Sequence, residues 1–345
     1  AAVESSEGVS QLTERWTVGL RDATILPDTL RTTPHGLLVG RSDGLSVLNA
    51  ETGTQRWNYT QTAPTDGLAY AEGRVYFCDG DDVVALDSQS GAEVDTFPID
   101  IASTSDSPDE IAVTETTLIA NTRDGIAAYD TTSGDELWTT DSRAANGFAV
   151  GDDRVYGIFG DEIRAFVLNS GRKLWTVQYS VHDDEFAGLR GTRPEGVVGF
   201  HSHAATGIGH DGVTLLSGET GAELVGLDET MPATFHVVDD AALVAHDGTI
   251  ERRKLSDESV VWDHSLTGST NALGNHTPMV RAGETLYVGT GRQVTALNTE
   301  TGAEVSRLQL SHPLEAVAPT GDQLFVAGGQ SVTAYEDQVT KVFDT

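Results

Sequence analysis

The chain has little cysteine and little lysine. Cys78 is the one cysteine among 345 residues, which excludes an internal disulfide and any zinc or iron–sulfur site built from four cysteines. The lysines are three, Lys173, Lys254 and Lys341. No run of about 18 apolar residues occurs, so the sequence predicts no transmembrane segment. Hydrophobic residues still make up 38% of the chain, which is enough for a packed core and excludes a disordered acidic chain.

Positive charge is scarce as well. Asp and Glu number 53 against 21 Lys and Arg, and the formal net charge is −32. Such a balance argues against binding nucleic acid, which needs a basic face. The carboxylates are spread along the chain, and with so few lysines the composition resembles that of proteins from salt-loving archaea. We therefore expect an acidic surface covered by salt cations; an acidic patch for one cation or for a basic partner is the alternative.

An internal repeat dominates the sequence. Each copy has two short apolar segments joined by a Gly or Asp turn, then a polar turn that ends in Gly. The last residue of the second segment recurs about every 41 residues, at Leu48, Leu86, Tyr129, Phe166, Leu216, Leu255, Leu297 and Tyr335. This period, with β patterning and no helical periodicity, predicts an all-β, eight-bladed β-propeller with four-stranded antiparallel blades.

Glycine and tryptophan follow the same register. A glycine stands five residues after most of these positions, as expected for a turn that requires a positive φ, at Gly53, Gly91, Gly134, Gly171, Gly221 and Gly302. Trp57, Trp138 and Trp175 each follow a turn glycine by four residues, and Trp262 occupies the same strand in a copy whose turn we predict to be two residues shorter. The equal spacing favours packing between blades over ligand stacking.

The two chain ends complement each other. Trp16 lies in ERWTVG, which is similar to ELWTTD around Trp138, while the last copy lacks a turn glycine and a Trp. We therefore expect residues 13–19 to close the ring as the outer strand of the last blade. The alternative outer strand is the tail at 339–343. On this reading residues 1–11 form a flexible segment, and residues 12–345 form one propeller domain.

One copy carries a recognisable motif. The pattern A-x-D-x-x-[ST]-G-x-x-x-W is met by Ala128, Asp130, Ser133, Gly134 and Trp138. It resembles the pyrroloquinoline-quinone (PQQ) repeat, whose family includes quinoprotein alcohol dehydrogenases and the bacterial outer-membrane assembly lipoprotein BamB. The resemblance covers residues 12 to 340 and implies an eight-bladed propeller. An archaeal cell has no bacterial-type outer membrane, so the assembly role itself is not transferred.

The quinoprotein enzymes of this family use an adjacent pair of bonded cysteines, a calcium-type metal and a catalytic aspartate. This chain has no second cysteine, and eight bare blades leave no insertion to cap a cofactor. We therefore expect a non-enzymatic scaffold for a protein or a ligand, with no catalytic residue and no cofactor. The alternative is a PQQ- or metal-dependent oxidoreductase. A hydrolase is a third class, for which the sequence shows no constellation of catalytic residues.

The blade with the longest spacing holds candidate metal ligands. His201 and His203 form a His-x-His pair, which places both imidazoles on one face of a strand, and His210 follows. The competing interpretation is a polar, glycine-rich hairpin loop. Cys78, in the second strand of its blade, is interpreted as a small buried hydrophobe.

The sequence begins at Ala1 without Met and opens with the polar AAVESSEG. This pattern is typical of a trimmed product, and many relatives are exported lipoproteins. We expect an extracellular or cell-surface location, with a lipid anchor upstream as an option, and with a cytoplasmic location as the alternative. The expected partner is another protein or a component of the cell envelope, bound at the propeller rim or channel.

Overall fold

The protein is described from a computed structural model, which describes residues 12–20, 23–60, 67–101, 111–144, 148–151, 153–178, 188–192, 197–202, 212–228, 234–238, 240–246, 248–267, 278–320 and 323–337. Within these ranges the chain forms strands connected by turns. Residues 1–11 and 339–343, about which the sequence makes predictions, lie outside the described residues. The described part contains no helix of the length and apolarity needed to cross a bilayer.

The described strands form eight four-stranded antiparallel sheets, which we number 1 to 8 along the chain. Sheet 1 comprises β2 (Ile25–Thr33), β3 (Gly36–Arg41), β4 (Gly44–Leu48) and β5 (Gln55–Tyr59). Sheets 2 to 4 comprise β6 (Leu68–Ala71), β7 (Arg74–Asp79), β8 (Asp82–Asp87) and β9 (Glu93–Phe97); β10 (Ile111–Val113), β11 (Thr117–Asn121), β12 (Ile126–Asp130) and β13 (Glu136–Thr139); and β14 (Phe148–Val150), β15 (Arg154–Phe159), β16 (Glu162–Val167) and β17 (Lys173–Gln178).

Sheets 5 to 7 comprise β18 (Gly188–Thr192), β19 (Val197–Ser202), β20 (Gly212–Ser217) and β21 (Glu223–Asp228); β22 (Thr234–Val238), β23 (Ala241–His246), β24 (Thr249–Lys254) and β25 (Val260–Ser265); and β26 (Met279–Ala282), β27 (Thr285–Thr290), β28 (Gln293–Asn298) and β29 (Glu304–Gln309). Sheet 8 comprises β30 (Ala316–Thr320), β31 (Gln323–Gly328), β32 (Ser331–Asp337) and, from the other end of the chain, β1 (Leu12–Gly19). β1 pairs with β32 in a register that runs from Leu12↔Asp337 to Gly19↔Ser331.

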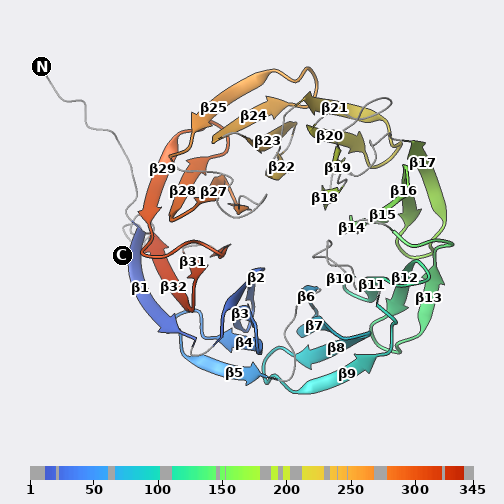
Figure 1. Cartoon of the computed structure of the whole chain (residues 1–345), viewed down its shortest axis with the longest axis horizontal. Coiled ribbons are helices and arrows are strands. Elements are labelled where there is room, and N and C mark those ends of the chain that lie inside the picture. Colours follow the sequence, from blue (N-terminus) through green and yellow to red (C-terminus); the bar gives the residue numbers. More distant parts are fainter. Residues whose placement is uncertain are drawn as a thin grey trace, which may run out of the picture.

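The sheets are arranged radially around a central axis (Figure 1). The first strand of each sheet lies nearest the axis and the fourth lies at the periphery. The predicted all-β propeller is therefore confirmed.

The core consists of the seams between neighbouring sheets. The second and third strands lie between neighbouring sheets, and every residue of β3, β4 and β31 is buried. These three strands are mainly apolar, with Arg41, Ser46 and Gln323 as buried polar residues. Outer strands such as β5 alternate between exposed and buried positions. One seam cluster joins Leu37 of sheet 1 to Phe325 of sheet 8, and another joins Tyr76 of sheet 2 to Leu118 of sheet 3.

Each tryptophan lies across a seam, on the turn of the following sheet. The indole N–H of Trp57 donates a hydrogen bond of 2.9 Å to the Ser88 carbonyl. Gly91 in that turn has a φ of +72°, and a Cβ there would lie 2.6 Å from Cδ2 of Trp57. The same close approach joins the pairs Trp16 and Gly53, Trp138 and Gly171, Trp175 and Gly221, and Trp262 and Gly302. Conformation and space therefore both require glycine at these positions.

Sheet 6 corrects one sequence-based prediction. Arg252 pairs with Trp262 and Arg253 with Val260, as Val47 pairs with Trp57 in sheet 1. The repeat position is therefore Arg253 and not Leu255, and the prediction of a turn two residues shorter is wrong. Glu258 occupies the place of the turn glycine, with a φ of +58°, and its N–H donates to the Lys254 carbonyl at 3.1 Å.

Candidate functional site

The topology separates two kinds of connection. In each antiparallel sheet, the turn between the second and third strands and the link to the next sheet lie at one end, which we call the connection face. The described strand ends that border residues 60–67, 98–110, 179–187 and 266–278 lie at this face. On the opposite face the first and second strands are joined by short turns, such as residues 34–35. Sequence outside the repeat is therefore concentrated on the connection face.

The three candidate metal ligands fall largely outside the described part of the chain. His201 lies in β19, where its backbone pairs with Gly188 and Val213, and its side chain is outside the description. His203 and His210 belong to residues 203–211, which are not described. Within the described residues, no three His, Cys, Asp or Glu side chains converge as metal ligands. The histidine site therefore stays a prediction.

A serine and a histidine meet on the connection face of sheet 8. The Oγ of Ser331 lies 3.2 Å from Nε2 of His312 and also donates to the Gly328 carbonyl at 3.3 Å. Nδ1 of His312 lies 3.4 Å from the Pro313 carbonyl, which can only accept, so the proton of a neutral His312 is on Nδ1 and Nε2 accepts from Ser331, in competition with the Gly328 carbonyl. The pair links the turn between β31 and β32 to the segment before β30.

Glu315 lies beside this pair. Burial raises the pKa of its carboxyl, and the Gly329 N–H and His312 only partly oppose that effect. Its Oε2 is buried without a hydrogen-bond partner. No described hydrogen bond joins this carboxylate to His312, so the three side chains form no relay.

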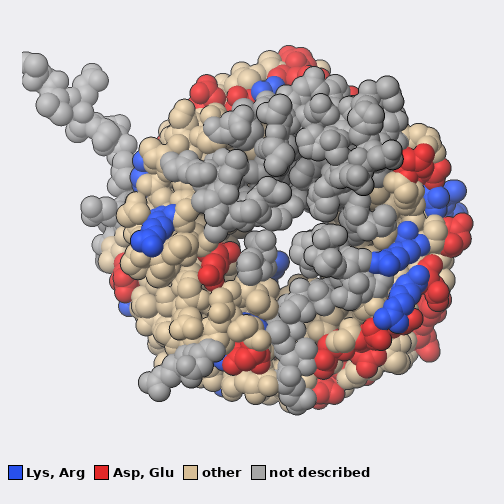
Figure 2. All heavy atoms as spheres, viewed as in Figure 1, with Lys and Arg blue, Asp and Glu red and all other residues tan. Residues whose placement is uncertain are grey.

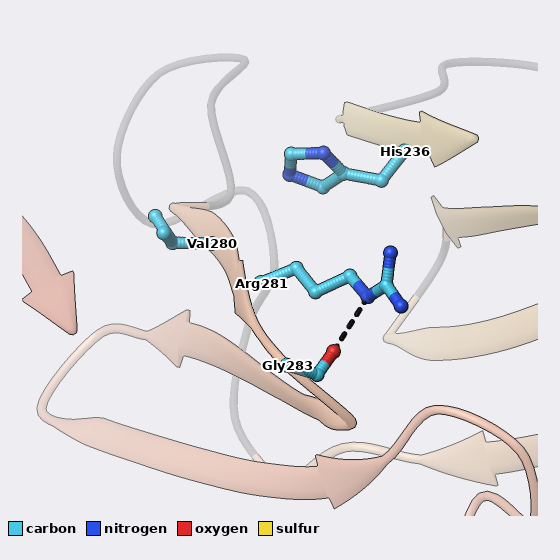
Figure 3. Close-up of a pocket in the computed structure, with 4 residues that line it drawn as sticks. All are labelled: His236, Val280, Arg281 and Gly283. Carbon is cyan, nitrogen blue, oxygen red and sulfur yellow. Dashed lines mark hydrogen bonds between the residues drawn. The ribbon is translucent and has the colours of Figure 1, made fainter. Parts of the chain in front are cut away.

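A pocket lies at the seam between sheets 6 and 7. Its cavity volume is about 330 Å³, and its described lining comprises His236 of β22, Val280 and Arg281 of β26, and Gly283 in the following turn. Figure 3 shows the side chains of His236 and Arg281 extending into the space between their two strands. Val280 extends away from His236, as expected for alternation along a strand, and packs in an apolar cluster with residues of sheet 8.

Two hydrogen bonds shape the pocket. Nε2 of His236 lies 2.6 Å from the Met279 carbonyl, which makes this nitrogen the donor and links the inner strands of the two sheets. Nε of Arg281 donates to the Gly283 carbonyl at 2.8 Å, and this bond folds the guanidinium back over its own turn (Figure 3). The sequence motifs do not indicate this site; the available signal is the presence of polar residues at inner-strand positions that are apolar in sheets 2 to 4.

Most described arginines are matched with carboxylates. Arg41 donates to both oxygens of Asp43, at 2.8 and 2.6 Å, and Arg253 lies 2.6 Å from Glu251. Figure 2 shows carboxylates gathered along the rim over β9, β13 and β17, with basic side chains beside them. Arg281 belongs to the remainder: within the described part of the chain it makes no ion pair, like Arg172 and Arg292, and its one hydrogen bond is the one to Gly283. It therefore offers a guanidinium to the pocket in a protein of net charge −32.

Comparison with protein-family profiles shows which family the chain belongs to. The profile of the family described as outer membrane protein assembly factor BamB matches residues 13–147, 80–233 and 246–342. The chain belongs to this family. The predicted resemblance to PQQ-repeat, BamB-like proteins is thereby confirmed. None of the curated proteins matches the sequence.

Solved structures give the same fold at low identity. BamB from Moraxella catarrhalis is 17% identical with a TM-score of 0.66, over 94% of this chain and 100% of that one. Sqt1 from Saccharomyces cerevisiae is 13% identical with a TM-score of 0.66, over 96% and 99%. A europium-containing methanol dehydrogenase is 11% identical with a TM-score of 0.58, over 93% and 86%. At these identities the likeness establishes the propeller fold and no activity.

The described residues do not fit the quinone cofactor that the PQQ-dependent alcohol dehydrogenases bind. Cys78, the one thiol of this BamB-family chain, is 3% exposed in β7 and packs in the cluster of Tyr76 and Ile111. It therefore faces the seam between sheets 2 and 3, and no second cysteine exists to form the adjacent pair. We derive no catalytic step through such a cofactor.

Proposed function

We propose that this protein is a non-enzymatic scaffold that docks another protein on its connection face. The observation that carries the proposal is the concentration of non-repeat sequence on one face of a BamB-family propeller. Turns on the opposite face are short and follow the repeat. Binding residues are disproportionately placed on loops that a rigid framework positions.

The proposed platform is an eight-bladed ring closed by β1. The pairing of β1 with β32 supports this closure, because it joins the two ends of the chain in one sheet. We further propose that the protein works at the cell surface or in the cell envelope, where the family name places its assembly factor, and that salt cations cover its acidic surface. The net charge of −32 supports adaptation to high salt.

Site-specific photocrosslinking tests the docking face. A photoreactive amino acid replaces Asp124 or Asp161, which are exposed in second-to-third connections on the connection face. The matched controls replace Glu72 or Glu284, exposed in first-to-second turns on the opposite face. Irradiation of cells that naturally produce the protein should give one crosslinked envelope protein from the first two positions and none from the controls. Equal crosslinking from both faces, or none from any position, would contradict the proposal.

A PQQ-dependent oxidoreductase is the second candidate, because the motif of Ala128, Asp130, Ser133, Gly134 and Trp138 resembles the PQQ repeat. Titration with PQQ and calcium, followed by tryptophan fluorescence and by dye reduction with methanol, separates the candidates. Saturable quenching at micromolar PQQ together with dye reduction would establish the enzyme. We expect neither, because the cysteine pair is missing.

A further inference from the structure

The seam between sheets 6 and 7 departs from the packing of the other seams. Counting back from the first turn of each sheet, Arg281 corresponds to Tyr70, Val113 and Val150 in sheets 2 to 4. Each of those three packs in an apolar cluster shared with the preceding sheet. A charged side chain therefore stands where an apolar one closes the seam in sheets 2 to 4, while sheet 1 has Thr32 at this position.

The facing position departs from the repeat as well. His236 corresponds to an alanine in four other sheets, at Ala69, Ala112, Ala149 and Ala318. The seam thus has a large polar ring on one side and a guanidinium that bends back to Gly283 on the other (Figure 3). The cavity of about 330 Å³ lies where the apolar filling is missing.

We propose that this pocket binds a carboxylate on the guanidinium of Arg281. The terminal nitrogens of Arg281 have no partner among the described residues, since its one hydrogen bond uses Nε. A guanidinium presents its N–H groups as a planar fork that matches the two oxygens of a carboxylate. The cavity volume is at the lower end of the range for small-molecule sites, which favours an organic acid of a few carbon atoms.

The overall charge does not prevent this binding. The nearest described carboxylates along the chain, Glu284 in the same turn and Asp240 in the facing turn, are exposed, and neither pairs with Arg281. Salt at about 0.15 M screens exposed charges beyond roughly 8 Å, so the rim carboxylates contribute little at the pocket. The inference goes beyond the scaffold proposal and does not depend on it, because Gly283 places the pocket next to a turn of the opposite face.

Calorimetric titration of the intact chain at one fixed KCl concentration tests the site, with succinate as probe and succinamide as its neutral counterpart. We expect saturable binding of succinate and none of succinamide. Arg281→Gln should weaken succinate binding by at least about tenfold, since a hydrogen-bonded charge is lost. Arg281→Lys should also weaken it, because the fork is lost while the charge remains. The control Arg172→Gln, an exposed arginine in the turn of sheet 4, should change the dissociation constant by less than about twofold.

A peptide arm identifies the source of the carboxylate. Gly-Gly-Ala with a free C-terminus is titrated beside its C-terminal amide. Tighter binding of the free peptide than of succinate would identify the ligand as the C-terminus of a protein. Tighter binding of succinate would identify it as a free organic acid, and either result supports the proposed site. Melting curves show whether each variant is folded. If Arg281→Gln does not fold, the binding measured with Arg281→Lys decides the outcome. Failure of both acids to bind the natural chain, or equal binding by the folded Arg281 variants, would overturn the proposal.

Discussion

Replacing Gly91 by alanine tests the packing of tryptophan on the turn of the next sheet. Gly91 has a φ of +72°, and a Cβ would lie 2.6 Å from Cδ2 of Trp57. Gly134 is the matched control, because its φ is +75° but a Cβ there would lie 3.5 Å from the nearest atom, in Phe97. The two substitutions share the backbone strain and differ in the clash.

The structure sets the expected magnitudes. An L-residue in the left-handed region costs about 1–2 kcal/mol, and loss of glycine flexibility in the unfolded chain returns about 0.4–1 kcal/mol. Gly134→Ala should therefore destabilise by about 0.5–1 kcal/mol. Overpacking against the buried indole of Trp57 adds about 1–3 kcal/mol, so Gly91→Ala should cost about 2–4 kcal/mol. For a cooperative chain of 345 residues, a difference of about 2 kcal/mol lowers Tm by about 3 °C.

Urea unfolding at constant KCl, followed by circular dichroism, measures both variants. A third protein combines Gly91→Ala with Trp57→Phe, which removes part of the ring that the methyl group meets. The double variant should lose less free energy of unfolding than the sum of the two single variants. Equal costs for Gly91→Ala and Gly134→Ala, or full additivity in the double variant, would refute the view that the indole requires glycine.

The fold and the net charge lead to five further measurable effects. Glu258→Gly should stabilise the protein by about 0.5–1 kcal/mol in the same assay, because it relieves a left-handed residue on which no Trp packs; an unchanged midpoint would contradict it. Trp16→Ala, at a partly buried ring, should cost about 2–3 kcal/mol, and deletion of 1–19 should lower Tm more than deletion of 340–345. Glu315→Gln should stabilise at pH 7, and its advantage should vanish below pH 4 in melts across pH, because a carboxyl with a raised pKa opposes folding only when it is ionised. Tm should rise from low to molar KCl because salt screens a net charge of −32; a flat Tm would refute that reasoning.

The propeller was predictable because most copies of the repeat meet the same physical requirements with the same residues. Glycine must stand where φ is positive, and the Trp four residues later must reach the next sheet, so spacing alone defines the turn and outer strand. In sheet 6 both cues are weak: Glu258 replaces the glycine, and Arg253 replaces the apolar residue. Backbone hydrogen bonds, and not side-chain type, set the register there, so the sequence pattern misplaced the repeat by two residues.

The pocket was hidden for a different reason. His236 and Arg281 are distant in the sequence, and neither belongs to a motif in its own segment. Their departure from the repeat is recognised only when the first strands are aligned by the register of their turns, since that alignment shows apolar residues at the same positions in other sheets. The histidines near 201–210 were the more conspicuous feature of the sequence, and their role stays a prediction.

A repeated scaffold constrains where specific chemistry can arise. At the seams of sheets 2 to 4 apolar residues occupy these inner-strand positions, and a polar residue buried there would lose hydration with no partner. Arg281 avoids that penalty because it is partly exposed and bonded through Nε to Gly283, while the seam beside it stays open. An apolar residue such as the valine of sheets 3 and 4 would close the seam and add buried area. A guanidinium at this position loses that apolar packing and instead places hydrogen-bond donors at a cavity. The propeller fold does not need these donors.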